Sequence, residues 1–202
     1  MTALTRKNLR PEGPRLSRDD WLNAAFTAVV EGGFDNLRVL IIAKALQVTR
    51  GSFYWHFSDH AELQVQLLER WRSQQVAVEA QLQAHVLSDP TQDLEHVLDE
   101  ALALDGPKLE NVRFELALRG LGRRDAQVAK LLVEVDAIRM RLFEAKFLRL
   151  TGDQKKASEL AALFYLTVVG CYQALSRPTN PPQLKSHLKH LIKSYLIDQQ
   201  AR

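Results

Sequence analysis

The stretch from Val48 to Phe57, VTRGSFYWHF, constrains this 202-residue chain more than any other. Thr49 is a favourable N-cap, so a short helix is predicted to begin there, with Val48 and Phe53 at hydrophobic-staple spacing. Phe53 and Phe57 are four residues apart, so they share a face that requires a core beneath it. The remaining side chains suit contact with a partner, and together they have the properties of a DNA-recognition helix: Arg50, Gly51, Ser52, Tyr54, Trp55 and His56.

Two further helices are predicted before this stretch. Ser17 is a favourable cap, and the helix after it repeats apolar residues with helical spacing until Gly32 and Gly33 end it. A second, short helix is indicated by an inward stripe of Val39, Ile42, Ala43 and Leu46. Two short helices separated by a tight turn form a helix-turn-helix unit, for which the first helix supplies part of the core.

The rest of the chain is predicted to be helical. A long fourth helix starts at Asp59 and stops before Pro90, over roughly 28 residues or about 40 Å. Gly- and Pro-containing breaks separate the helices that follow. Their expected ranges are 91–104, 108–121, 126–150, 154–176 and 183–199. The fold class is therefore all-α, with about nine helices in total.

Composition and charge narrow the class of protein. The chain is 46% hydrophobic and 25% charged, as in an ordinary soluble globular protein, and its net charge of +3 gives no broad basic surface. We find neither an apolar run of the roughly 18 residues that span a membrane nor a secretory signal at the start. The single cysteine, Cys171, excludes an internal disulfide. A cytoplasmic protein is the expectation. Residues 1–15 are basic, and they form either a flexible solvated arm or one that reaches DNA.

Residues Leu22 to Leu63 resemble the TetR family of bacterial transcriptional regulators. The matching features are Ala25-Phe26, Gly33-Phe34, Ile42-Ala43, the stretch from Val48 to Phe57, and Glu62-Leu63. The resemblance implies a helix-turn-helix DNA-binding domain over residues 16–60 and a helical effector-binding and dimerisation domain over 61–202. It further implies a transcription regulator, usually a repressor, that binds palindromic double-stranded operator DNA as a homodimer and is released by a small-molecule effector.

The resemblance also assigns roles within the recognition helix. Arg50, Gly51, Ser52 and Trp55 are expected to approach base edges, where an arginine can donate two hydrogen bonds to a guanine. Three further residues are expected to seat the helix on DNA phosphates, which orients it without reading the sequence: Thr49, Tyr54 and His56.

The sequence departs from the family pattern in three ways. Arg38 stands where the family often has a phosphate-contacting Thr, and His60 where it usually has a phosphate-binding Lys. We expect both to contact phosphate, His60 only when its imidazole is charged, which requires a pH below neutrality. Leu40 and Ile41 give the second helix an unusually apolar outer face.

Two sites in the C-terminal half are indicated with less support. Five residues are candidates for an effector pocket, with core packing as the default interpretation: Trp71, Glu115, Arg119, Tyr165 and Tyr172. The last two helices are apolar around much of their girth, which favours a four-helix dimer interface over a larger monomeric core. Its candidate residues are Leu163, Leu166, Gly170, Ala174, Leu188, Leu191 and Tyr195.

No constellation of residues predicts an enzyme, a metal site or a cofactor. Cys171 has no histidine within one turn, so core packing is favoured over a nucleophile. His187 and His190 have ligand spacing, but the lysines around them favour a solvated face. The alternative to a regulator is a small-molecule-binding helical protein with little or no affinity for DNA.

Overall fold

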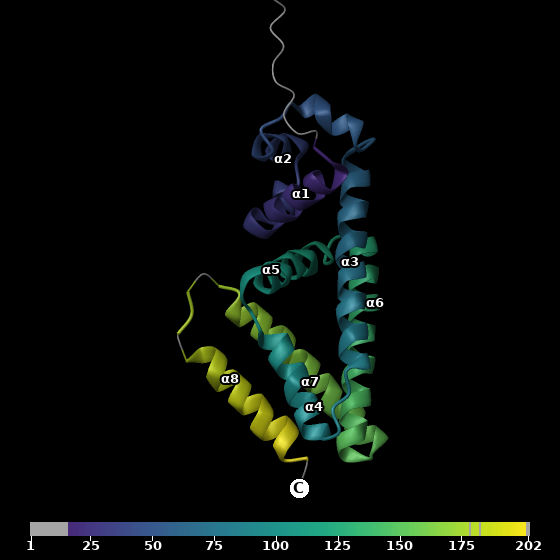
Figure 1. Cartoon of the computed structure of the whole chain (residues 1–202), viewed down its shortest axis with the longest axis vertical. Coiled ribbons are helices and arrows are strands. Elements are labelled where there is room, and N and C mark those ends of the chain that lie inside the picture. Colours follow the sequence, from purple (N-terminus) through teal and green to yellow (C-terminus); the bar gives the residue numbers. More distant parts are fainter. Residues whose placement is uncertain (1–15, 178, 182, 201–202) are drawn as a thin grey trace, which may run out of the picture.

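The computed structural model describes residues 16–177, 179–181 and 183–200, and this part of the chain is helical with no strand (Figure 1). The elements are α1 (Arg18–Gly32), η1 (Phe34–Asn36), α2 (Val39–Ala45), η2 (Arg50–Trp55), α3 (His60–Ala84), α4 (Pro90–Leu102), α5 (Gly106–Leu121), α6 (Ala126–Thr151), α7 (Gln154–Leu175), α8 (Leu184–Ile192) and η3 (Lys193–Asp198). The described residues hold nine helices, as predicted, when η2 is counted as the recognition helix, η3 as the end of α8, and the three-residue η1 is left out. The basic arm, residues 1–15, lies outside them.

The first helix begins and ends where the sequence predicts. The Ser17 hydroxyl accepts a hydrogen bond from the Asp20 amide at 3.2 Å, and the Asp20 carboxylate accepts one from the Ser17 amide at 2.7 Å. This reciprocal capping box satisfies two amides that have no partner within the helix. At the other end Gly33 has φ 71°, a left-handed conformation that glycine adopts without steric cost.

The recognition element differs from the predicted helix in two ways. It is a 3₁₀-helix, η2, and the Thr49 side chain makes no capping hydrogen bond, so that part of the prediction is wrong. Instead the Thr49 carbonyl accepts from both the amide and the hydroxyl of Ser52, at 3.1 and 2.8 Å. The i to i+3 bond tightens the first turn, and it leaves the Thr49 hydroxyl free to face a partner.

The turn between α2 and η2 contains the one non-glycine residue with positive φ among the described residues. Gln47 has φ 57°, a region that glycine or asparagine usually occupies. Hydrogen bonds on both sides maintain this conformation, from the Gln47 amide to the Lys44 carbonyl at 3.1 Å and from the Val48 amide to the Ala43 carbonyl at 3.0 Å. The turn thereby fixes the angle between the two helices of the helix-turn-helix unit.

The long helix α3 has 25 residues, about three fewer than predicted, because it begins at His60 rather than Asp59 and ends at Ala84, two residues before Val86. The Asp59 side chain caps it by accepting a hydrogen bond from the Glu62 amide at 2.8 Å. At about 1.5 Å per residue, α3 spans about 37 Å. It runs beside α6 along one side of the molecule and connects the helix-turn-helix unit to the remaining helices (Figure 1).

Two apolar cores hold the helices together. The first combines the helix-turn-helix unit and the start of α3 with residues of α5 and α6, among them Phe114, Leu118 and Val135. The Phe114 ring stacks on Phe26 of α1 with 4.8 Å between ring centroids, and it lies 5.7 Å from the ring of Phe34. The second core lies among α4, α6, α7, α8 and η3. The division at residue 60 remains a prediction, since the first core extends across it.

The helix α7 bears on the expectation that no apolar run spans a membrane. Gln154–Leu175 is long and apolar enough, by length and composition, to cross a membrane, although we predicted no such segment. Its apolar residues are spread around the helix rather than gathered in an unbroken run. One stripe of α7 packs in the second core through Phe164, Val168 and Cys171, which is how a core helix of a helical bundle is built.

We predict that Phe114→Ala lowers the free energy of unfolding by about 3–5 kcal/mol, the usual cost of truncating a buried phenylalanine. Phe114 is fully buried and joins α5 to α1 and η1, so its loss should loosen the contact between these elements. Chemical denaturation measures the change, with the exposed Val133→Ala as control. A change no larger for Phe114→Ala than for the control would contradict the assigned role.

Candidate DNA-binding surface and effector cavity

The recognition element η2 has one buried and one exposed side. Phe53 and Phe57 are buried and their rings stack with 5.3 Å between centroids, while Trp21 meets Phe53 edge-on at 5.5 Å. On the outer side the Trp55 side chain is 88% exposed, and Arg50, Gly51 and Tyr54 are exposed with it. A rigid aromatic anchor therefore presents an indole, a guanidinium and a phenol to the solvent.

The other residues of this segment that were predicted to contact DNA lie beside the exposed side of η2. Thr49 is exposed, whereas Ser52 and His56 are half-buried. The Ser52 hydroxyl donates to the Thr49 carbonyl, and the His56 ring lies 6.3 Å from that of Trp21. The Arg50 guanidinium approaches the Tyr54 hydroxyl at 3.4 Å.

Arg38 and His60 line one open hollow with Arg50, between the start of α2 and the start of α3. Nε2 of His60 is hydrogen-bonded to the Leu37 carbonyl. Because a carbonyl only accepts, Nε2 must carry a proton, and Nδ1 is the nitrogen that remains for another partner. Leu40 is 70% exposed and Ile41 is also exposed, so the apolar outer face expected for α2 is present.

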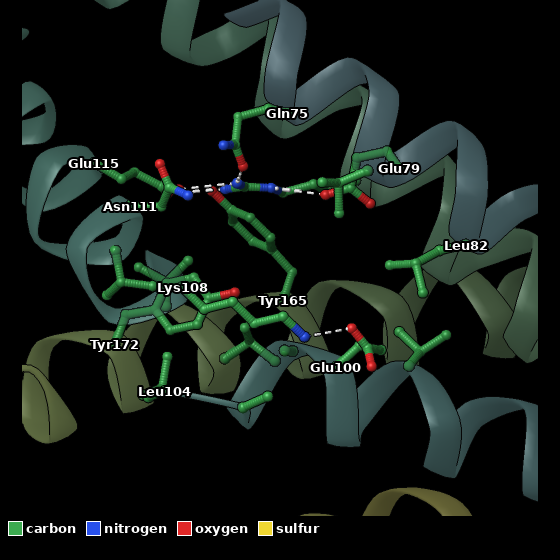
Figure 2. Close-up of a pocket in the computed structure, with 18 of the residues that line it drawn as sticks. Gln75, Glu79, Leu82, Glu100, Leu104, Lys108, Asn111, Glu115, Tyr165 and Tyr172 are labelled. Carbon is green, nitrogen blue, oxygen red and sulfur yellow. Dashed lines mark hydrogen bonds and ion pairs between the residues drawn. The ribbon is translucent and has the colours of Figure 1, made fainter. Parts of the chain in front are cut away.

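A second concave site, a cavity of about 140 Å³, lies among α3, α4, α5, α6 and α7 (Figure 2). Three of the five predicted pocket residues line it: Glu115, Tyr165 and Tyr172. Arg119 lies just outside and donates to Glu115 and Tyr165. Trp71 is 1% exposed and packs in the first core, so the structure does not bring it into this cavity.

Arg139 connects the polar side chains at one end of the cavity through hydrogen bonds. Its guanidinium donates to both oxygens of Glu115 at 2.8 Å, to Gln75 at 2.8 Å and to Glu79 at 3.1 Å, and Figure 2 shows these three partners converging. Arg119 extends the network to Asp136 with hydrogen bonds of 2.7 and 3.1 Å. The network thereby joins α3, α5 and α6, and through the Tyr165 hydroxyl it also reaches α7.

The sequence analysis did not identify Arg139 as a residue of this cavity, although its position in the helical pattern indicates that it is buried. Arg139 follows Val135 by four residues and precedes Phe143 by four, so it lies on the buried stripe of α6. A charged residue on such a stripe requires buried partners, since an unpaired charge in a core is strongly unfavourable. That requirement points to the carboxylates of the facing helices.

The carboxylates of this network differ in their proton affinity. Burial alone would raise the pKa of Glu115, but Arg139 and Arg119 outweigh it and hold that pKa below its usual range. The stability that Glu115 contributes is therefore complete above its usual pKa and is lost as the pH falls through the lowered value. Burial has the larger effect at Glu79 and raises its pKa despite Arg139. Burial likewise raises the pKa of Tyr165 to about 12.

Of the seven residues predicted for a dimer interface, four are exposed apolar side chains on α7, α8 and η3. Leu166 is 65% exposed, and Leu163, Leu191 and Tyr195 are also exposed. A Cβ added at Gly170 would meet no atom within 4 Å, so the backbone is open there. Ala174 is half-buried, and Leu188 packs partly against the second core of its own chain.

Residues 22–67 match the family described as bacterial regulatory proteins, tetR family. Residues 22–67 therefore form a TetR-family N-terminal domain. This TetR domain contains α1, α2, η2 and the first part of α3, as the resemblance of residues 22–63 predicts. A match to the HTH-type transcriptional regulator AcrR of Shigella flexneri is 33% identical over 86 residues. It covers 43% of this chain and 40% of that relative.

Solved structures share the fold over most of the chain. A transcriptional regulator from Rhodococcus sp. Rha1 superposes with a TM-score of 0.75 at 21% identity, covering 93% of this chain and 99% of that one. A protein from Saccharomonospora viridis, described as a transcriptional regulator in complex with choline, gives a TM-score of 0.72 at 17% identity, covering 89% and 94%. Beyond the TetR domain these similarities show the fold alone.

We predict that Arg139→Met destabilises the protein by about 3–5 kcal/mol, because it leaves buried carboxylates without their cation. Urea denaturation at neutral pH measures the loss. Arg141→Met is the matched control, since Arg141 lies on the same helix and is exposed. Equal stabilities of the two variants would show that the buried network contributes little.

Proposed function

We propose that the protein is a transcriptional regulator, most simply a repressor, that binds palindromic operator DNA as a homodimer and is released by a small-molecule effector. The observation that carries this proposal is η2, a short element whose buried aromatic face fixes the position of an exposed Arg50, Tyr54 and Trp55. A large aromatic side chain that is held exposed on a rigidly packed element suits contact with a partner molecule.

On DNA, the exposed side of η2 would enter the major groove. Arg50 is free to form a bidentate pair with a guanine, and exposed Gly51 allows the backbone to come close to the bases. Thr49, Tyr54 and His56 would contact phosphates on one side. Arg38 and His60, which line the adjacent hollow, would contact phosphates on the other.

The dimer would form through the exposed apolar face of α7, α8 and η3, giving a four-helix interface with its symmetry mate. A two-fold axis there would present two η2 elements to one side of the DNA. To read successive major grooves they must lie about 34–36 Å apart. The operator would then be a palindrome whose half-site spacing matches this distance.

Two helices connect the effector cavity to the TetR domain. In α5, Phe114 packs on α1 and η1 of that domain, and the next residue, Glu115, lines the cavity. In α3, Leu67 and Trp71 belong to the first core, while Gln75 and Glu79 line the cavity. An effector that favours a different tilt of these helices would change the spacing of the recognition elements, typically with about 1–3 kcal/mol of coupling. The choline bound in the Saccharomonospora viridis structure supports a small molecule as effector.

The experiment that tests this proposal is selection of bound DNA from a random pool with the full-length protein. We expect an enriched palindrome, and we expect affinity to fall steeply as salt is raised, because phosphate contacts release counterions. If no sequence is enriched and DNA binding does not depend on salt concentration, the regulator hypothesis is rejected. The alternative, a small-molecule-binding protein without DNA affinity, is then favoured.

We predict that Arg50→Ala weakens binding to the selected operator by about 1–3 kcal/mol and relaxes the preference at one base pair in each half-site. Electrophoretic mobility shift at fixed salt measures both effects. Arg141→Ala, an exposed arginine on α6, is the control and should bind as wild type. An Arg50 variant that keeps full sequence preference would exclude this residue as a reader.

We further predict that His60→Gln weakens binding to the selected operator. With Nε2 held by the Leu37 carbonyl, Nδ1 is the ring nitrogen of His60 that remains for a phosphate. His85→Gln, at the far end of α3, should bind as wild type in the same mobility-shift measurement. If His60→Gln binds the operator as tightly as the wild type, His60 does not make this contact.

A further inference from the structure

Glu79 has a carboxylate oxygen without a partner in the described structure. The residue lines the effector cavity from α3 and is 7% exposed. Its Oε1 accepts a hydrogen bond from Nε of Arg139 at 3.1 Å. Its Oε2 is buried, and no donor among the described residues reaches it. Leaving such a group unsatisfied is unfavourable, and more so when it is charged, so a ligand that donates to it gains affinity.

The charged residues that line the cavity have a negative net charge. The lining carboxylates are Glu79, Glu100 and Glu115, and the lining cations are Lys108 and Arg139. Lys108 and Glu100 form a pair of 2.7 Å at the end opposite Glu79, as Figure 2 shows, and so cancel each other. Including Arg119 and Asp136, which pair just outside the cavity, does not alter the balance. With all groups ionised, one negative charge therefore remains at the end that holds Glu79 and Glu115.

The cations of the cavity have little capacity left for an anionic ligand. Arg139 already donates through all three of its nitrogens, to Glu79, Glu115 and Gln75. The ammonium of Lys108 is paired with Glu100. An anion would have to displace a carboxylate from one of them, which leaves a buried charge unpaired.

The other walls of the cavity are apolar and aromatic. Leu82, Val97 and Leu104 offer a surface for a hydrocarbon body, and Tyr165 and Tyr172 supply ring surfaces. Aromatic faces attract cations through the ring quadrupole. Burial also raises the pKa of Glu79, so its carboxyl is protonated more readily than a surface glutamate, and a cation nearby would favour the ionised form.

We infer that the effector cavity takes a small amphiphilic ammonium ion, whose N–H group donates to Oε2 of Glu79 and whose hydrocarbon part occupies the apolar walls. Because Oε2 requires a hydrogen-bond donor, a protonated amine fits better than a quaternary ammonium, which has none. This inference rests on the proposed function only in naming the ligand as its effector, and the binding step stands independently of DNA.

The test is isothermal titration calorimetry of the full-length protein at neutral pH with four probes that each carry a six-carbon chain. These are hexylammonium, hexanol, hexanoate and hexyltrimethylammonium. We expect hexylammonium to bind at least tenfold more tightly than each of the others. Tighter or equal binding of hexanoate or hexanol would overturn the inference that the cavity selects a cation, and equal binding of the quaternary ion would overturn the hydrogen bond to Glu79.

A pair of variants locates the interaction. Glu79→Gln retains an acceptor for Arg139 but removes the charge, and it should lower hexylammonium affinity at least tenfold while leaving hexanol binding unchanged. Glu100→Gln removes a charge from the same cavity where the carboxylate is already paired, and should change affinity less than threefold. Unchanged hexylammonium affinity in Glu79→Gln would reject the assignment. If either variant fails to fold, the four probes on the wild-type protein decide the question.

Measuring operator release with the same probes separates this inference from the proposed function. Hexylammonium that binds through Glu79 and does not alter operator affinity would leave the ligand class standing and refute the effector mechanism. Operator release by hexanoate without hexylammonium binding would refute the ligand class and leave the effector mechanism standing.

Discussion

The buried guanidinium of Arg139 is the interaction on which the C-terminal half of the structure depends. It binds Gln75 and Glu79 of α3 and Glu115 of α5 from its own position on α6, so three helices are fixed by one planar group. Apolar packing alone would allow these helices to slide, because dispersion contacts have no fixed direction. A guanidinium has a rigid fork of donors, so it sets both the spacing and the rotation of its partners.

The same group places the polar end of the cavity next to the apolar contact with the helix-turn-helix unit. Glu115, held by Arg139, follows Phe114, which stacks on Phe26. On one helix, adjacent side chains point in different directions, so α5 faces the cavity on one side and the first core on another. The polar network and the aromatic contact therefore meet on one helix, at neighbouring residues of the chain.

Much of the fold could be predicted because helical signals are local. Caps such as Ser17 and Asp59 and the breaks after α4 to α7 place the helices within a few residues, and the aromatic pair Phe53 and Phe57 identifies the buried face of η2. The sequence could not show that η2 is a 3₁₀-helix or that Gln47 takes a positive φ, since both depend on the tertiary packing of the turn. The partners of Arg139 lie 24 to 64 residues away, beyond any local pattern.

The shared first core has a consequence for how the helix-turn-helix unit could be exchanged in evolution. Phe26 and Phe34 of this unit have their aromatic partner in α5, far along the chain. A recombination event that joined this unit to a different C-terminal domain would leave both rings without that partner unless the new domain offered a matching surface. The helix-turn-helix unit is therefore not a module that can be exchanged independently of the helices that follow it.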